Sequence, residues 1–187
     1  VDDPEVAAID RAATKLVELS NKARRVEAAL RESSTNRRPL DVVAIVEQTM
    51  AAMSREFPDA ELALSAPDSL TARTTEGLTF AVEELVRNGV VHNGSEPPSV
   101  RVTIERECDG DELASDATPE MVAITVADDG PGIPETETVA LTTGYETDLD
   151  HSTGLGLWLV NWVTTAAGGS LTYHTDDDLG GAAVTLR

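Results

Sequence analysis

Apolar residues recur with two different periods along the chain, and these periods predict its helices and strands. Between residues 4 and 32 they recur at spacings near three and four, as at Ile9 and Leu16, which is typical of one helix face. Asp3 and Pro4 supply an N-cap and a first-turn proline. Such a helix would measure roughly 45 Å, more than a small core needs. It either lies along its own domain or forms half of a dimerising helical hairpin.

The rest of the chain predicts helices mixed with a mostly antiparallel sheet. Residues 33–38 are polar and basic and read as a linker. After it, the patterns predict strands at 39–41, 61–65, 69–73, 100–107, 121–127, 171–175 and 182–186, and helices at 42–56, 75–93 and 154–166. The strands at 61–65 and 69–73 are expected to form a hairpin, and Asp41 to cap the first helix. This order predicts an α+β sandwich at residues 37–187, preceded by a separate helical segment at 1–36.

The stretch around Asp128 combines a strand, a carboxylate and a glycine turn. Side chains alternate along a strand, so Ile124, Val126 and Asp128 share one face. If helices cover that face, the carboxylate points between sheet and helices, where it needs a partner. Gly130 and Gly132 would let a flat ligand lie against bare backbone. The stretch therefore suits the amino edge of a purine, and the alternative is an ordinary Asp-Gly-Pro-Gly turn.

Two further stretches carry candidate chemistry. On the helix at 75–93, Glu84, Asn88 and His92 lie at positions i, i+4 and i+8 along one edge of the apolar stripe. An amide oxygen there suits Mg²⁺, although an ordinary solvated helix edge explains the same pattern. At 152–158, glycines at a loop-to-helix junction expose backbone N–H groups that can bind an anion. The alternative there is close helix packing.

Composition narrows the class of protein. The chain has 187 residues, a formal net charge of -20 and one cysteine, Cys108. These features exclude a disulfide framework and disfavour nucleic-acid binding, since phosphate contacts need clustered cations. No apolar run is long enough to span a bilayer and no signal peptide is evident, so we expect a cytoplasmic location, with a membrane tether of the full-length protein left open. Lys15 and Lys22 are the only lysines, and so acidic a surface favours a halophile over an ordinary acidic mesophile.

Together these motifs resemble the ATP-binding domain of sensor histidine kinases, in the GHKL superfamily shared with gyrase, the mismatch-repair ATPases and a heat-shock chaperone. The resemblance covers residues 37–187. Residues 84–92 are similar to the asparagine box, residues 128–132 to the first glycine box and residues 154–157 to the second. The residues at 146–147 and 155–158 are similar to those of family members from haloarchaea.

The resemblance implies a Bergerat fold, a two-layer α/β sandwich here preceded by one long helix, and a role for each motif. It implies that Asn88 coordinates Mg²⁺ and that Asp128 takes the adenine amino group of ATP. Glu84 and Asn88 become the catalytic candidates, with Glu84 orienting either an imidazole or a water. Residues 133–153 would form a lid. The implied nucleotide-binding residues are Asn88, His92, Asp128, Gly130, Gly132, Ile133, Thr153, Gly154, Leu155, Gly156 and Leu157.

The implied reaction transfers the γ-phosphate of ATP to a histidine outside this fragment, and then to an aspartate on a response regulator receiver domain. Residues 4–32 would be the second helix of the dimerisation and phosphoacceptor hairpin, which makes the full-length protein a homodimer. The three histidines, His92, His151 and His174, all lie in the nucleotide domain, so the phosphoacceptor is missing. One alternative is an ATPase in which Glu84 activates water. Another is a non-catalytic nucleotide-sensing module, motivated by the absence of lysine and arginine from residues 107–186.

Overall fold

The computed structural model describes residues 37–107, 121–133, 154–176 and 178–187, together with scattered positions between residues 6 and 27. Each of those scattered positions has a helical backbone and an exposed side chain. Residues 108–120 lie outside the described residues, as does the whole predicted lid at 133–153 except Ile133. None of the described helices is both long and apolar enough to span a membrane.

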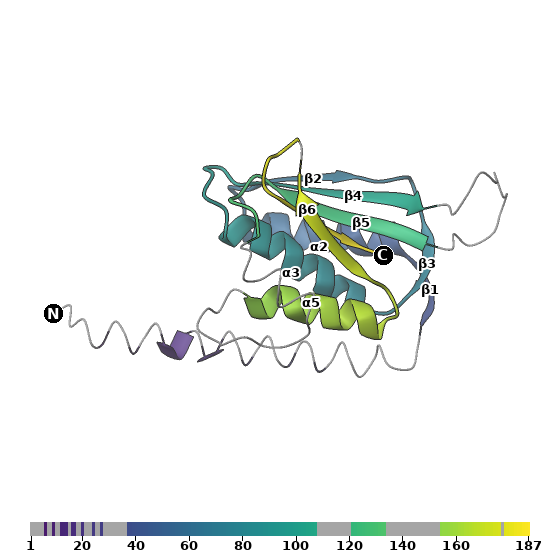
Figure 1. Cartoon of the computed structure of the whole chain (residues 1–187), viewed down its shortest axis with the longest axis horizontal. Helices are drawn as coiled ribbons and strands as arrows, with labels where there is room; N and C mark the ends of the chain where they lie inside the picture. The colour runs from purple at the N-terminus through teal and green to yellow at the C-terminus, as the bar shows by residue number, and fades with distance from the viewer. Residues whose placement is uncertain are drawn as a thin grey trace.

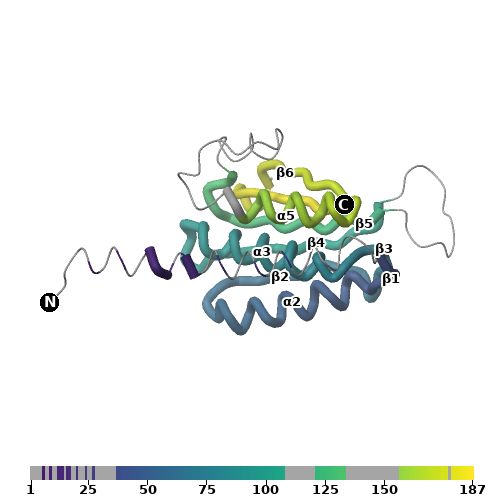
Figure 2. The backbone as a smooth tube through the Cα atoms, turned by 90° about the horizontal axis from the view of Figure 1, so that it is seen from below, coloured from purple at the N-terminus to yellow at the C-terminus, as the bar shows by residue number. Residues whose placement is uncertain are grey.

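Three helices cover one face of a five-stranded sheet (Figure 1). Figure 2 shows them side by side, with α3 between α2 and α5. The strand order is β2-β4-β5-β7-β6, in which β2 and β4 are parallel and the other neighbours antiparallel. The predicted two-layer α+β fold is therefore confirmed. The elements are β1 (Arg38–Asp41), α2 (Val42–Glu56), β2 (Glu61–Ser65), β3 (Thr71–Thr74), α3 (Gly77–Val91), β4 (Ser99–Glu107), β5 (Met121–Asp128), α5 (Gly154–Ala166), β6 (Leu171–Thr175) and β7 (Ala182–Leu186).

The predicted hairpin between residues 61–65 and 69–73 is wrong. β2 pairs with β4, whereas β3 pairs with β1 in a separate two-stranded sheet. The reason lies in Leu70, which is 4% exposed and belongs to the core. Its carbonyl accepts from Val42 N at 2.9 Å, and its N–H donates to the Asp41 carboxylate at 3.3 Å. These bonds hold the chain beside the start of α2 and away from β2.

Helix α2 begins where the sequence places a cap and is tied to α3 at its other end. Asp41 Oδ1 accepts from Val43 N at 3.1 Å and from Ala44 N at 3.4 Å, the interaction that makes aspartate a favoured N-cap. Near the end of α2, Glu56 accepts two hydrogen bonds from the Arg87 guanidinium of α3. This hydrogen bond from Arg87 to Glu56 raises the pKa of Arg87. The two helices are thereby fixed side by side on the sheet.

The core fills the layer between the helices and the inner face of the sheet. β5 contributes Val122, Ile124 and Val126, each no more than 8% exposed, as period-two alternation predicts. Val126 pairs with the buried Val184 of β7, so the apolar row continues onto the next strand. The same row ends at Asp128, the last residue of β5. The fold therefore brings a carboxylate to the edge of the core.

Candidate nucleotide-binding site

The Asp128 carboxylate is fixed through one oxygen and open at the other. Its Oδ1 accepts from Gly130 N at 2.9 Å and from Ala182 N, on β7, at 3.2 Å. Its Oδ2 accepts no hydrogen bond from any residue that the structure describes, and it lies beside Gly89, where an added Cβ would be 3.6 Å away. Among the described residues, every fully buried side-chain oxygen has a hydrogen-bond partner. Because Oδ2 has none, it is not fully buried and solvent can reach it. One oxygen is thus left to accept a hydrogen bond from a ligand.

Burial raises the pKa of Asp128, and the nearby carboxylates of Asp129 and Asp176 act in the same direction. The two backbone N–H donors oppose this rise without cancelling it. A raised pKa means that the charged form is disfavoured in the folded domain, so a donor supplied by a ligand would stabilise it. A partly buried carboxylate with defined partners is a good candidate for a functional site.

Glycines surround Asp128 at points of close approach. A Cβ at Gly181 would lie 2.3 Å from the Asp128 carbonyl oxygen and 2.6 Å from Gly130 N, distances that no real side chain tolerates. A Cβ at Gly89 would lie 3.2 Å from Asp128 Cβ, which shows how closely α3 approaches the end of β5. Gly132 has φ of 81° and faces open space. The turn after β5 therefore presents bare backbone toward solvent.

Helix α3 places its three polar candidates at different depths. Glu84 is 2% exposed, within the protein interior. Asn88 is half-buried, and its side chain has no hydrogen-bond partner among the residues that the structure describes. His92 is exposed at the C-cap of the helix. Because Gly89 abuts Asp128, the helical turn that carries Asn88 lies beside the carboxylate.

A hydrogen-bond network that the sequence analysis missed joins the end of α3 to the turn after β5. Asp129 Oδ1 accepts from Asn93 Nδ2 and from Ser99 N, the latter at 2.9 Å. Asn93 Nδ2 also donates to Gly89 O at 3.1 Å, and Ser95 Oγ donates to Asp129 O at 3.3 Å. The signal in the sequence was an asparagine at the end of the helix predicted at 75–93 and an aspartate beside a glycine turn. This network fixes the spacing between the two candidate motifs.

Asp129→Asn is expected to destabilise the domain by about 1 kcal/mol at pH 7, because charge-assisted hydrogen bonds become neutral ones. Burial acts to raise the pKa of Asp129, but hydrogen bonds from Ser99, Asn93 and Ser95 outweigh it, so the pKa lies below 3.8. A lowered pKa stabilises the fold above the unfolded value, and this stabilisation is lost as the pH falls through the folded pKa. Urea unfolding at a series of pH values measures it.

The control for this prediction is Asp68→Asn, which changes an exposed carboxylate. It should leave unfolding unaltered at both ends of the pH range. The difference between Asp129→Asn and the wild type should shrink toward zero as the pH falls below 3.8. A variant as stable as the wild type at pH 7 would contradict the role given to this network.

The second glycine motif begins α5, as predicted. Residues 154–157 form the first turn of the helix, in which Gly156 is buried and Leu157 is 5% exposed. The first N–H groups of any helix lack partners within it, so this turn can bind an anion. Ile133 is half-buried against the core cluster, whereas Thr153 lies outside the described residues.

A protein cage for a metal ion is not found in the described ranges, where no three His, Cys, Asp or Glu side chains gather. Mg²⁺ in nucleotide sites is usually held by one or two protein oxygens, with water and phosphate oxygens completing its shell. The amide oxygen of Asn88, half-buried and without a described hydrogen-bond partner, fits such a site.

This fold and site define a nucleotide-binding α+β domain. The chain belongs to the family described as histidine kinase-, DNA gyrase B-, and HSP90-like ATPase, whose sequence profile matches residues 74–187. Membership of this ATPase family shows that the domain binds ATP. No curated protein matches the chain.

Solved structures with the same fold include several histidine kinases. The ATP-binding domain of PrrB from Mycobacterium tuberculosis is 24% identical, with 81% of this chain and 96% of that chain covered, at a TM-score of 0.60. The Acinetobacter baumannii histidine kinase AdeS is 17% identical over 100% of this chain and 84% of that chain, at 0.62. Full-length ShkA in complex with AMPPNP is 23% identical over 98% of this chain and 37% of that chain, at 0.63. At these identities the likeness shows the fold.

Proposed function

We propose that the chain is the ATP-binding catalytic domain of a two-component sensor histidine kinase, joined to part of its dimerisation hairpin. The observation that carries this proposal is the Asp128 carboxylate, fixed through Oδ1 and open at Oδ2 beside a glycine turn. The open oxygen accepts from the adenine amino group. Gly130 and Gly132 let the purine ring lie against the backbone. ShkA, whose fold is similar, was solved in complex with AMPPNP, an observation that supports this assignment.

The phosphates of ATP would extend from the Asp128 end of the site toward the first turn of α5. There the N–H groups of residues 154–157 contact the nucleotide. Thr153, which directly precedes them, and Ile133, which follows the first glycine motif, contact it as well. Asn88 holds Mg²⁺, which when bound neutralises phosphate charge. His92, exposed at the end of α3, adds a further donor. With no lysine or arginine in residues 107–186, backbone N–H groups replace the usual basic side chains.

Glu84 and Asn88 are the proposed catalytic residues. Glu84 lies one helical turn before Asn88 on the same face of α3 and is 2% exposed. From this position its carboxylate would orient an incoming imidazole or a water. Phosphoryl transfer depends mainly on positioning and charge neutralisation, so such an orienting role is sufficient.

The proposed reaction moves the γ-phosphoryl group of ATP to a histidine nitrogen outside this chain, with ADP as the leaving group. An aspartate on a receiver domain then takes the phosphoryl group. Residues 1–36 would belong to the hairpin through which the full-length kinase forms a homodimer in the cytoplasm. Two observations support this division: described positions in residues 6–27 are helical, and the likeness to AdeS extends over the whole chain.

The chain supplied with Mg-ATP is expected not to become phosphorylated on histidine. Transfer needs a nucleophile held in line about 3 Å from phosphorus. His174 lies exposed on β6, opposite Ala183 on the sheet face away from the helices, and His92 lies among the proposed phosphate contacts. Acid-labile, base-stable ³²P incorporation measures the outcome. Adding a partner helix that carries a histidine should restore labelling.

The controls are His92→Ala, His151→Ala and His174→Ala. Stoichiometric labelling of the chain alone, lost in one of these variants, would show that the phosphoacceptor lies within it. If ATP is hydrolysed at the same rate with and without the partner helix, and no label is transferred, the domain is an ATPase instead.

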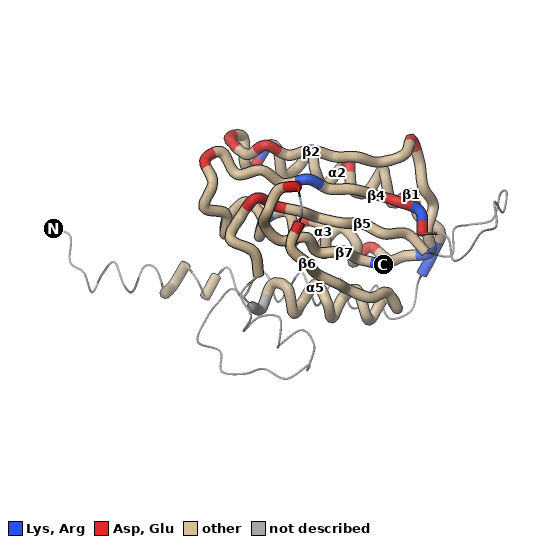
Figure 3. The backbone as a smooth tube through the Cα atoms, turned by 45° about the horizontal axis from the view of Figure 1, so that its top comes forward, with Lys and Arg blue, Asp and Glu red and all other residues tan. Residues whose placement is uncertain are grey.

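We further propose that the surface is adapted to concentrated salt, as in haloarchaeal proteins. The net charge of -20 supports this, and Figure 3 shows acidic positions on strands and loops around the sheet. Stability and ATP affinity should both rise as KCl approaches about 1 M, where the Debye length is roughly 3 Å. Screening then weakens the repulsion among surface carboxylates and between them and the triphosphate. Calorimetric titration across a KCl series measures this, and a steep loss of affinity would contradict it.

A further inference from the structure

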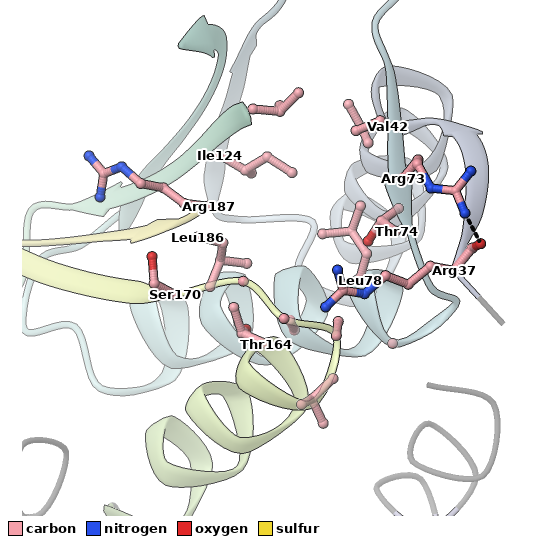
Figure 4. Close-up of a pocket in the computed structure, with 18 of the residues that line it drawn as sticks. Arg37, Val42, Arg73, Thr74, Leu78, Ile124, Thr164, Ser170, Leu186 and Arg187 are labelled. Atoms are coloured by element: carbon pink, nitrogen blue, oxygen red, sulfur yellow. Dashed lines mark hydrogen bonds between the residues drawn. The ribbon is translucent and has the colours of Figure 1, made fainter. Parts of the chain in front are cut away.

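A cavity lies at the end of β5 opposite to Asp128, separate from the proposed nucleotide site. It has a volume of about 630 Å³ and is bordered by Met121 and Val122, the first residues of the strand that ends at Asp128. Its walls come from the β1–β3 sheet, the first turns of α3 and the end of α5 (Figure 4). The volume falls within the range of about 300–1,000 Å³ that small-molecule sites occupy.

The floor of this cavity is apolar. Val42, Ile124 and Leu186, which line it, are 1%, 4% and 4% exposed and belong to the core. Leu78 of α3 and Ala72 of β3 complete the apolar wall. These side chains offer no hydrogen bonds, so the part of a ligand that lies over them must be apolar. The hydroxyl side chains of Thr74, Thr164 and Ser170 line other parts of the cavity.

One guanidinium, that of Arg37, crosses the opening. Figure 4 shows its side chain reaching from the residue before β1 toward the end of α5. It packs so closely on Gly168 that a Cβ there would lie 1.4 Å from its Nη2. Its side chain has no hydrogen-bond or ion-pair partner in the described part of the chain. The cavity therefore has a cation free to bind an anion at its mouth.

The other two arginines of the cavity are already engaged. Arg73 donates to the carbonyl oxygen of Arg37 at 3.2 Å, and in Figure 4 its guanidinium points out of the cavity. Arg187 is paired with Glu107 at 2.8 Å and donates to Thr172. In Figure 3, basic positions gather at this end, near β1 and the C-terminus. Arg37 is therefore the one arginine of the cavity without a described partner, so an anion with a single charge fits this mouth best.

We infer that this cavity binds a small amphipathic monoanion, of which a medium-chain carboxylate is the simplest example. The carboxylate would pair with Arg37, and the alkyl chain would lie over Val42, Leu78 and Ile124. A ligand in this position joins the β1–β3 sheet to the end of α5. Arg37 also directly follows residues 1–36, so the site lies at the junction between the two proposed segments.

The test titrates the whole chain with saturated carboxylates from butyrate to decanoate and with 1-alkanols of matched length, followed by calorimetry. We expect saturable 1:1 binding with an affinity that rises about fourfold per added methylene until the cavity is full. The alkanol of equal length should bind about tenfold more weakly, as expected for a lost charge-assisted hydrogen bond. Nucleotide is absent from these titrations, so their failure would leave the proposed ATP site untouched.

Arg37→Gln should weaken octanoate binding about tenfold and leave octanol binding unchanged. Arg38→Gln is the matched control, since Arg38 is the next residue, is paired with Glu76 and does not line the cavity. Ala72→Leu, which fills part of the cavity, should weaken the longer carboxylates most. If Ala72→Leu fails to fold, the comparison of Arg37→Gln with Arg38→Gln still shows whether Arg37 binds the carboxylate.

Three results would overturn the inference. The first is the absence of saturable octanoate binding at millimolar concentration. The second is equal binding of octanoate by the wild type and Arg37→Gln, or equal binding of octanoate and octanol. The third is a dimer in sedimentation equilibrium that octanoate converts to monomer, which would assign the cavity to a second copy of the chain.

Discussion

Asp128→Asn is expected to weaken Mg-ATP binding roughly 100-fold or more while the domain stays folded. The open Oδ2 of Asp128 can only accept, which matches the amino group of adenine. An asparagine turned so that its carbonyl keeps the bonds from Gly130 N and Ala182 N presents an amide N–H₂ to that amino group. Two donors then face each other, and both are left unsatisfied. Calorimetric titration with Mg-ATP measures the loss.

Measuring the stability of Asp128→Asn distinguishes a loss of ATP binding from unfolding of the domain. Burial raises the pKa of Asp128, so its contribution to stability is fully present below the unfolded value of 3.8 and is lost as the pH rises through the folded pKa. At pH 7 the uncharged asparagine should therefore unfold no earlier than the wild type. A variant that is destabilised at pH 7, or that keeps the ATP affinity of the wild type, would contradict the account of this carboxylate.

Gly181→Ala is expected to destabilise the domain by about 2 kcal/mol or more and to remove nucleotide binding. The new Cβ would lie 2.3 Å from the Asp128 carbonyl oxygen, 2.5 Å from its Oδ1 and 2.6 Å from Gly130 N. Two of these atoms are backbone, so the start of β7 must move away from the turn after β5. That movement breaks the bond from Ala182 N to Asp128. Urea unfolding and ATP titration give the two readouts.

Gly94→Ala is the matched control, because no atom lies within 4 Å of a Cβ at that position. Its stability should change by less than about 0.5 kcal/mol. If Gly181→Ala has the same free energy of unfolding as Gly94→Ala and binds ATP normally, the close packing of β7 against Asp128 is not needed for stability or for nucleotide binding.

Local signals in the sequence predicted much of the fold. The end of α5 is an example, since Gly168 has φ of 71° and Gly169 N donates to Thr164 O at 2.9 Å, the arrangement that glycine after a helix favours. The position of Asp128 at the end of an apolar strand was predictable for the same reason. Both signals, the alternation of side chains along β5 and the glycines that follow the strand, depend only on residues that are close in the sequence.

Contacts between distant residues were not predictable. Ala182 N, which holds Asp128, lies 54 positions away and is brought there by the pairing of β5 with β7. The network between Asn93 and Asp129 needs the ends of α3 and β5 to meet, which no periodicity reveals. The wrong hairpin at 61–65 and 69–73 has the same origin. Nearness in sequence favoured pairing, whereas the burial of Leu70 decided the path of the chain.

The central claim is that Asp128 selects adenine, and titration of the wild-type chain with Mg-ATP and Mg-GTP tests it most directly. Guanine places a carbonyl oxygen where adenine has its amino group, so two acceptors would face each other at Oδ2. We expect one ATP bound per chain and GTP bound roughly 100-fold more weakly. Equal affinities for ATP and GTP, or no binding of ATP, would contradict the account.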